Sequence, residues 1–456
     1  TAAGVDYKGH SSAATFFDVN NDGLLDLFVS NICVYTSAER GLGGYFRALP
    51  DAFSGHTKPD RGESSRIYIN QGKNVFKESA SEFGLKENAF NGDAAFADVN
   101  GDGFLDLYLS NMQGDDLFFL NEGGRKFTEA TPQFFPKTPW GAMGLNFADF
   151  NQDGLLDLFV TDMHSDMSGM QTKLSKAKAD FPFETAKSEQ WCTAEYSDAY
   201  LNNAANNIFG NALYLATAPG KFTESSEQFA AETFWPWGMS VGDVNADGYP
   251  DAFITAGMGY GFRYGINSLL LNDAGKRFAP AELVTGVEPR LRNRIRKHAF
   301  TLDCSGADKD HPLCQGRTGS LPVSEVLSSR SSAMVDLDND GDLDLVVNDM
   351  DDRPQILINS LAALGDVKWL KVKLRGTTSN RDGLGARITL TTVGNSWHQQ
   401  HDGKSGYLAQ SSLPLYLGLA NAEKIDSLEI TWPSGTKQKL TELKPNQLLT
   451  VQEPAK

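Results

Sequence analysis

The nine residues Asp18–Asp26 read DVNNDGLLD, and this pattern returns four more times along the chain. The further copies are DVNGDGFLD at 98–106, DFNQDGLLD at 149–157, DVNADGYPD at 243–251 and DLDNDGDLD at 336–344. Each copy is followed by a short apolar run rich in β-branched and aromatic residues, which predicts a buried strand. A segment of small and aromatic residues precedes each copy and predicts another strand. An internal repeat therefore organises this part of the chain.

A second element follows each copy at a variable distance. It combines an apolar segment, a Gly-containing turn and a second short segment, which together predict a β-hairpin. The hairpin segments are SRIYINQGKNVFKES at 65–79, DLFFLNEGGRKFTEA at 116–130, NALYLATAPGKFTES at 211–225, NSLLLNDAGKRFAPA at 267–281 and a truncated PQILINS at 354–360.

One period thus holds about four strands. Four strands in about 40–50 residues are typical of a β-propeller blade. We expect an all-β fold, a calcium-binding β-propeller over residues 1–362. Five blades carry the motif, and six or seven are expected in total because a closed ring leaves no exposed sheet edge. Insertions at 32–63, 162–208 and 285–328 are either long loops or blades without the motif.

The motif has Asp or Asn at positions one, three, five and nine, and Gly at position six. This is the pattern of a calcium loop, because Ca²⁺ takes six to eight oxygen ligands and the glycine permits a sharp bend. Position seven usually supplies a backbone carbonyl, so Asp342 is expected to contribute its main chain. The expected side-chain ligands are Asp18, Asn20, Asp22, Asp26, Asp98, Asn100, Asp102, Asp106, Asp149, Asn151, Asp153, Asp157, Asp243, Asn245, Asp247, Asp251, Asp336, Asp338, Asp340 and Asp344.

These five expected Ca²⁺ ions are interpreted as mainly structural, each tying strands together. The last loop offers four Asp where the others offer three Asp and one Asn, so it is expected to bind most tightly, and Asp340→Ala is expected to cost more stability than Asp18→Ala. The chain has 58 acidic against 41 basic residues and a formal net charge of −17. Much of this surplus is then a metal requirement. The acidity also argues against nucleic-acid binding, which needs a basic face.

From about Trp369 the acidic loops end and alternating segments such as WLKVKLRG and ARITLTTV begin. They predict a small β-sandwich-like domain over residues 363–456. Its segments 380–387, 405–407, 417–419 and 432–435, which read NRDGLGAR, SGY, LGL and WPSG, resemble the ASPIC/UnbV domain.

The five acidic loops resemble those of FG-GAP/VCBS-repeat β-propellers, which also form the heads of integrin α-subunits. The combination of both modules is similar to the cartilage acidic protein family. This resemblance implies one calcium ion in each matching loop and a secreted or periplasmic location. Members of such families have mostly unassigned roles, and bacterial relatives occur near natural-product biosynthesis genes.

Two functional classes stay open. The first is an exported binding module for a protein, glycan or small-molecule ligand, without a transmembrane segment, since no apolar run approaches about 18 residues. The alternative is an enzyme, a cyclase, lyase or isomerase, with its site in the propeller funnel. No GxSxG, HExxH or P-loop motif is present.

The insertion that begins at 162 contains a possible reactive pair. Asp162 and His164 could act as acid and base, and His164 with neighbouring methionines could bind copper. A loop that merely packs its methionines is the competing interpretation.

Aromatic residues form a second candidate site. Trp140, Trp235 and Trp237 precede inner strands and could line the funnel, although packing between blades is the simpler interpretation. Tyr260 and Tyr264 flank Arg263, which could bind an anionic group.

A third candidate is the run of basic residues from 290 to 298. With Arg at 290, 292, 294 and 296, alternate spacing would place four arginines on one side of a strand. They could bind a polyanion, but pairing with the protein's own carboxylates is the commoner outcome.

Four cysteines suit an oxidising compartment. Cys304 and Cys314 flank nine residues and are expected to form a local disulfide, which would leave Cys33 and Cys192 as a long-range pair. Four free thiols are the alternative. The chain starts at Thr1, which suggests that an N-terminal segment has been removed.

Overall fold

The computed structural model describes residues 3–41, 44, 46–49, 59–163, 207–208, 210–258, 264–365 and 367–455. This part of the chain is nearly all-β, as predicted. Its only α-helices are single turns of four residues, namely α1 (Thr131–Phe134), α4 (Ser226–Phe229) and α5 (Leu361–Leu364).

Five antiparallel sheets follow one another along the chain, one for each copy of the acidic motif. We number them sheet one to sheet five. Sheet one contains β1 (Ser11–Phe17), β2 (Asp26–Asn31), β5 (Arg66–Asn70) and β6 (Phe76–Glu78). Sheet two contains β7 (Asn91–Ala97), β8 (Asp106–Asn111), β9 (Leu117–Asn121) and β10 (Phe127–Glu129). Sheet three contains β12 (Ala142–Ala148), β13 (Asp157–Asp162), β15 (Ala212–Ala218) and β16 (Lys221–Glu224). Sheet four contains β17 (Pro236–Gly242), β18 (Asp251–Ala256), β19 (Ser268–Asn272) and β20 (Phe278–Pro280). Sheet five contains β23 (Ser329–Val335), β24 (Asp344–Asp349) and β25 (Gln355–Leu357).

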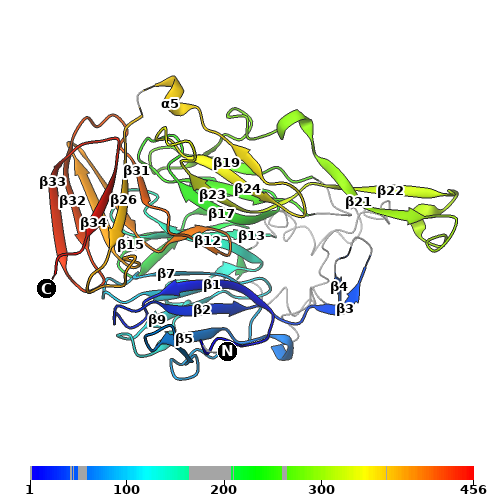
Figure 1. Cartoon of the computed structure of the whole chain (residues 1–456), viewed down its shortest axis with the longest axis horizontal. Coiled ribbons are helices and arrows are strands. Elements are labelled where there is room, and N and C mark those ends of the chain that lie inside the picture. Colours follow the sequence, from blue (N-terminus) through cyan, green and yellow to red (C-terminus); the bar gives the residue numbers. More distant parts are fainter. Residues whose placement is uncertain are drawn as a thin grey trace.

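Apolar side chains fill the space between successive sheets. Because strand residues alternate between the two faces, each sheet offers one apolar face to the sheet before it and one to the sheet after it. Phe17 of sheet one stacks on Phe96 of sheet two with ring centroids 3.8 Å apart. The first strands pack side by side in the order β1, β7, β12, β17, β23. The result is a stack of twisted sheets (Figure 1).

The stack is open at sheet five. The second residue of the third strand is buried against the next sheet in sheets one to four, where it is Ile67, Phe118, Leu213 or Leu269. The corresponding Ile356 of sheet five is 60% exposed. Among the described residues no sheet closes on itself, and the sheets with the motif number five. The expected ring of six or seven blades is therefore not seen in this part of the chain.

Two of the insertions contain two-stranded ribbons in their described parts. The insertion at 285–328 forms a ribbon of β21 (Arg296–Asp303) and β22 (Ser320–Val326), so it is not a blade. Within the insertion at 32–63, β3 (Thr36–Arg40) pairs with β4 (Phe46–Ala48). Most of the insertion at 162–208 lies outside the described residues; its end, β14 (Asn207–Ile208), pairs with β11 (Thr138–Pro139).

The disulfide expected within the last insertion is present. Cys304 and Cys314 are bonded at the tip of the β21–β22 ribbon, where they pack with Leu302 and Val323. Cys33 is a buried free thiol, and its expected partner Cys192 lies outside the described residues.

The C-terminal domain contains two sheets that share one apolar core. Leu370 and Val372 from one sheet meet Ile388 and Leu390 from the other, as predicted for a sandwich-like domain. A hairpin of β29 and β30 extends from it. The strands are β26 (Trp369–Arg375), β31 (Leu415–Gly418) and β34 (Gln447–Gln452) in one sheet, β28 (Asn395–Gln400), β27 (Arg387–Thr392), β32 (Ile425–Thr431) and β33 (Lys437–Leu443) in the other, and β29 (Lys404–Gly406) with β30 (Ala409–Gln410) in the hairpin.

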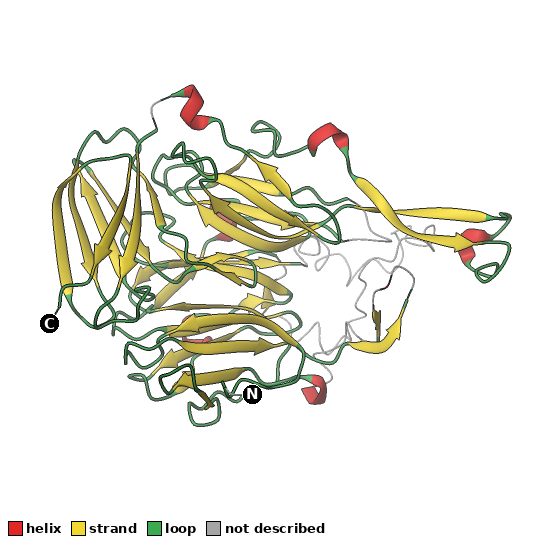
Figure 2. Ribbon diagram, in the orientation of Figure 1, coloured by secondary structure: helices red, strands yellow, loops and turns green. Residues whose placement is uncertain are grey.

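The C-terminal domain lies along one side of the stack, beside the ends of the strands. The β21–β22 ribbon projects from the opposite side (Figures 1 and 2). The acidic loops lie on the side that the domain covers. For example, a side chain added at Gly341 of the last loop would collide with Trp369 of the domain. The motif loops therefore lie at the boundary between the two parts of the molecule.

Candidate metal centres and the cavity between the domains

The first four acidic loops share one hydrogen-bond pattern. In the first loop, the Asp18 carboxylate accepts hydrogen bonds from the backbone N–H groups of Asp22 (3.0 Å) and Gly23 (2.9 Å). The Asn20 amide donates to Asp22 (3.0 Å), and the N–H of Leu24 donates to the other oxygen of Asp22 (2.9 Å). The three loops that follow repeat this pattern. It folds positions one, three and five toward one another.

The glycine at position six is required by the backbone. Its φ lies between +86° at Gly23 and +104° at Gly341, a left-handed region that disfavours a Cβ. This is the sharp bend that the sequence predicts.

The aspartate at position nine ties three segments together. In the first loop, one oxygen of Asp26 accepts from the N–H of Val19 (3.0 Å) and the other from the N–H of Asn70 (2.8 Å), at the end of the third strand. The same two bonds occur in all five sheets. Burial raises the pKa of Asp26 to about 7 and that of Asp106 to about 8. The carboxylate at position nine therefore accepts hydrogen bonds from the backbone, a role that the calcium-loop pattern by itself does not indicate.

The last loop has the donor set of a cation site. Oxygens of Asp336, Asp338 and Asp340 lie within 4.8 Å of one another. The Oδ1 atom of Asp336 is buried and has no hydrogen-bond partner. Three converging carboxylates and one unpaired buried oxygen fit a hard cation such as Ca²⁺. The Asp342 carboxylate is also directed inward and accepts from the N–H of Ala362 (2.8 Å).

The C-terminal domain supplies two cations to the loops. The Lys371 ammonium group, on β26, pairs with Asp336 Oδ2 of the last loop. The Arg387 guanidinium, on β27, lies 3.0 Å from Asp98 Oδ2 of the second loop. Both carboxylates occupy position one of the motif.

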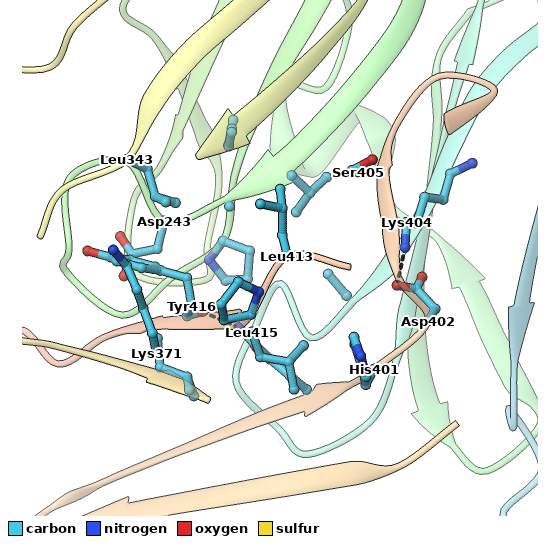
Figure 3. Close-up of a pocket in the computed structure, with 18 of the residues that line it drawn as sticks. Asp243, Leu343, Lys371, His401, Asp402, Lys404, Ser405, Leu413, Leu415 and Tyr416 are labelled. Atoms are coloured by element: carbon cyan, nitrogen blue, oxygen red, sulfur yellow. Dashed lines mark hydrogen bonds between the residues drawn. The ribbon is translucent and has the colours of Figure 1, made fainter. Parts of the chain in front are cut away.

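A cavity of about 320 Å³ lies between the C-terminal domain and the last three motif loops. Its wall combines apolar side chains such as Leu413 and Leu415 with polar ones such as Asp243, Lys371 and Asp402, which Figure 3 shows around a common space. This volume is at the small end of the range for ligand sites.

Two titratable groups of the cavity have shifted pKa values because they are enclosed. Burial raises the pKa of Asp402 to about 6, and burial lowers the pKa of His401 to about 4. One Asp402 oxygen accepts from the backbone N–H of Lys404 (2.9 Å), the dashed line in Figure 3. At neutral pH the cavity can therefore present a carboxylate and an uncharged imidazole.

The β29–β30 hairpin fills the centre of the stack, where a funnel was expected. Buried Lys404 pairs with buried Asp93 of β7 (2.7 Å), and the N–H of Leu408 donates to the same carboxylate (3.3 Å). Tyr407 is buried and its hydroxyl lies 3.7 Å from the sulfur of Met143. This contact was not expected from the sequence. Its one signal is Asp93, a charged residue within the apolar segment GDAAFA.

Asp162 is not arranged as an acid or base. Its Oδ2 atom accepts from the backbone N–H groups of Trp140 (3.1 Å), Gly141 (3.3 Å) and Gly210 (3.4 Å), so it organises backbone. His164, its expected partner, lies outside the described residues, as do Tyr260 and Arg263.

Four of the five residues of the expected aromatic site lie in the described part of the chain. Trp140 is buried, and the Trp237 ring lies 4.0 Å from the Arg330 guanidinium. Trp235 has a φ of +51°. Tyr264 belongs to a separate buried network, in which its hydroxyl donates to Glu288 (2.9 Å) and accepts from Arg290 (2.6 Å).

The basic run pairs with the protein's own carboxylates, as the commoner interpretation holds. Arg290 pairs with Asp349, Arg294 with Asp352 (2.5 Å) and Lys297 with Glu325 (3.0 Å). The expectation that four arginines share one side of a strand was wrong. Arg292 lies in a 3₁₀ turn, and only Arg296 belongs to β21.

Two families match parts of the chain. The FG-GAP-like repeat family matches residues 49–109 and 98–160, and the ASPIC and UnbV family matches residues 376–456. The chain combines FG-GAP-like repeats with a C-terminal ASPIC/UnbV domain. The C-terminal β domain, with its Lys371 and Arg387 at the acidic loops, thus contains the ASPIC/UnbV match.

One curated relative is a T-cell immunomodulatory protein homolog from Plasmodium yoelii yoelii. It is 26% identical over 252 residues, which cover 50% of this chain and 34% of the relative. The chain thus spans about a third of the length of the relative that it matches. No helix among the described residues is long and apolar enough to cross a bilayer.

Proposed function

We propose that this chain is an exported β-propeller-type binding module whose FG-GAP-like loops bind about five structural Ca²⁺ ions. The observation that carries the calcium proposal is the last loop, in which three carboxylates converge and Asp336 Oδ1 is buried without a partner. Like charges held this close are costly unless a cation lies between them.

The residues at positions one, three and five would hold each ion, with the further oxygens that Ca²⁺ requires. When bound, calcium would neutralise the converging carboxylates. The chain's own part is to keep these groups together: position nine anchors the loop to the second and third strands, and the glycine at position six makes the bend. Because the loops lie against the ASPIC/UnbV domain, the ions would lie at the boundary between the two parts.

A binding role is supported by several features together. The described sheets have the strand order expected for propeller blades, and the β21–β22 ribbon projects away from them (Figure 2). The disulfide at its tip suits an oxidising compartment outside the cytoplasm. The relative's name, which refers to T cells, also supports a role in recognition. The ligand class remains a protein, glycan or small molecule, the last of which the interdomain cavity could admit.

The enzyme alternative draws no support from the described residues. The Oδ2 atom of Asp162 accepts three backbone hydrogen bonds, and the hairpin with Tyr407 lies where the funnel was expected. The other two candidate catalytic residues, His164 and Arg263, lie outside the described part.

Removal of calcium tests the structural part of the proposal. Each ion that binds only the native state adds about 2.7 kcal/mol at a hundredfold excess over its dissociation constant. We expect the melting temperature of the full chain to fall by several degrees or more in EGTA and to recover when Ca²⁺, but not Mg²⁺, is restored. An unchanged melting curve in excess EGTA would refute structural calcium.

A further inference from the structure

We propose that Lys371 and Arg387 are built-in cations that weaken calcium binding in the last and the second motif loops. The chain would then have two classes of site, three tight and two weak. This inference rests on the proposed calcium binding and adds to it which loops are regulated and by which residues.

The Lys371 ammonium group contacts the first carboxylate of the last loop. It pairs with Asp336 Oδ2, while the other oxygen of the same carboxylate is the buried atom without a partner. The lysine side chain is only 14% exposed and the aspartate side chain 1%. The Trp369 ring lies 4.7 Å from the ammonium nitrogen and covers Gly341 of the loop. The ammonium group is therefore partly shielded from solvent and lies in contact with the first carboxylate of the loop.

Arg387 has the corresponding position at the second loop. Its guanidinium pairs with Asp98 Oδ2 and also donates to the backbone oxygen of Asp98. Both contacts are made to the first residue of the motif. Lys371 likewise contacts the first residue of the last loop, Asp336. In two loops of the repeat, a cation of the C-terminal domain thus pairs with the carboxylate at position one of the motif.

The other three loops have no such cation in the described part of the chain. Within the described residues, Asp18, Asp149 and Asp243 have no ion pair with a basic side chain. The glycines at position six of these loops lie against Thr378, His398 and Trp397 of the C-terminal domain. No lysine or arginine of the C-terminal domain therefore competes with a divalent ion for the first carboxylate of these three loops, as far as the structure describes them.

A positive charge within contact distance of a ligand opposes Ca²⁺ by direct repulsion and by occupying a carboxylate oxygen. The effect is reciprocal, because calcium in these two loops must equally weaken the two ion pairs to the C-terminal domain. High calcium would therefore loosen the domain at these two points, whereas low calcium leaves the ion pairs intact.

The test is calcium titration of the chelator-treated full chain by calorimetry, with Lys371→Met beside Lys373→Met. Lys373 lies on the same strand but is exposed, so it is a matched control. We expect three tight and two weak sites in the wild type and in Lys373→Met. Lys371→Met should move one site to the tight class, with an affinity gain on the order of tenfold, and Lys371→Met with Arg387→Met should move both.

Five equal sites in the wild type, or the same isotherm for Lys371→Met and Lys373→Met, would overturn this inference alone. If none of the chains binds calcium, the proposed function fails as well. Thermal melting guards against a folding defect: Lys371→Met should melt below the control in EGTA and match it at saturating calcium. A deficit that persists at saturating calcium would make Lys371 a purely structural residue and contradict the proposal.

Discussion

At the scale of single residues, charge count and charge environment lead to opposite rankings of the loops. Four Asp side chains make the last loop the richest in carboxylates, so the sequence predicts that it binds calcium most tightly. The structure adds Lys371 to that loop, and a tethered cation offsets one of those charges. The first loop has fewer carboxylates but no competing cation among the described residues.

We therefore expect Asp18→Ala to cost more calcium-dependent stability than Asp340→Ala, the reverse of the order predicted by counting carboxylates. Loss of one saturated site should lower the free energy of unfolding by about 2–3 kcal/mol. The measurement is urea unfolding of both variants with calcium and with EGTA. A larger calcium-dependent loss for Asp340→Ala would restore the ranking by carboxylate number.

His401 gives the protein a stability term that depends on pH. Its pKa is lowered to about 4 in the folded chain by burial, against about 6.5 when unfolded, so protonation favours unfolding. The contribution of neutral His401 to the free energy of unfolding is fully present above pH 6.5. It is lost as the pH falls toward 4, which lowers the free energy of unfolding by about 3 kcal/mol.

We expect His401→Leu to reduce the loss of stability between pH 7 and pH 4.5, measured by urea unfolding in EGTA. The exposed His298→Leu serves as the control and should keep the wild-type profile. Identical pH profiles for the two variants would show that His401 does not titrate as its burial implies.

At the scale of elements, the β29–β30 hairpin joins the two domains through a buried ion pair. Lys404 and Asp93 are both nearly inaccessible, so removing one partner leaves the other as an isolated buried charge. Such losses cost about 3–5 kcal/mol, whereas removing both partners costs less.

We expect Lys404→Met to destabilise the chain by about 3–5 kcal/mol, and Lys404→Met with Asp93→Asn to recover part of that loss. A double-mutant cycle by chemical unfolding gives the coupling. Simple addition of the two single losses would mean that the hairpin is held by packing and not by this pair.

At the scale of the whole molecule, the open end of the stack is the main difference from the predicted ring. Ile356 and Leu269 hold the same place in their sheets, but a following sheet covers only Leu269. We expect Leu269→Ala to cost about 2–5 kcal/mol and Ile356→Ala to stay within about 0.5 kcal/mol of the wild type. Equal losses in thermal or urea unfolding would show that a further element covers sheet five in solution.

Several features follow from the sequence by itself, because neighbouring residues encode them. The motif at Asp18–Asp26 indicates the bend at Gly23, apolar alternation indicates the strands, and the short spacing of Cys304 and Cys314 indicates their disulfide. Each depends on backbone preference or periodicity over about ten residues.

The tertiary structure alone decided the contacts between distant segments. Lys404 and Asp93 are 311 residues apart in the chain, and Lys371 meets Asp336 across the boundary of two domains. No local pattern specifies such pairs, because they depend on how the C-terminal domain is seated on the acidic loops. For the same reason, the exposure of Ile356 reflects the end of the stack and not its own strand, whose apolar pattern matches that of the buried strands.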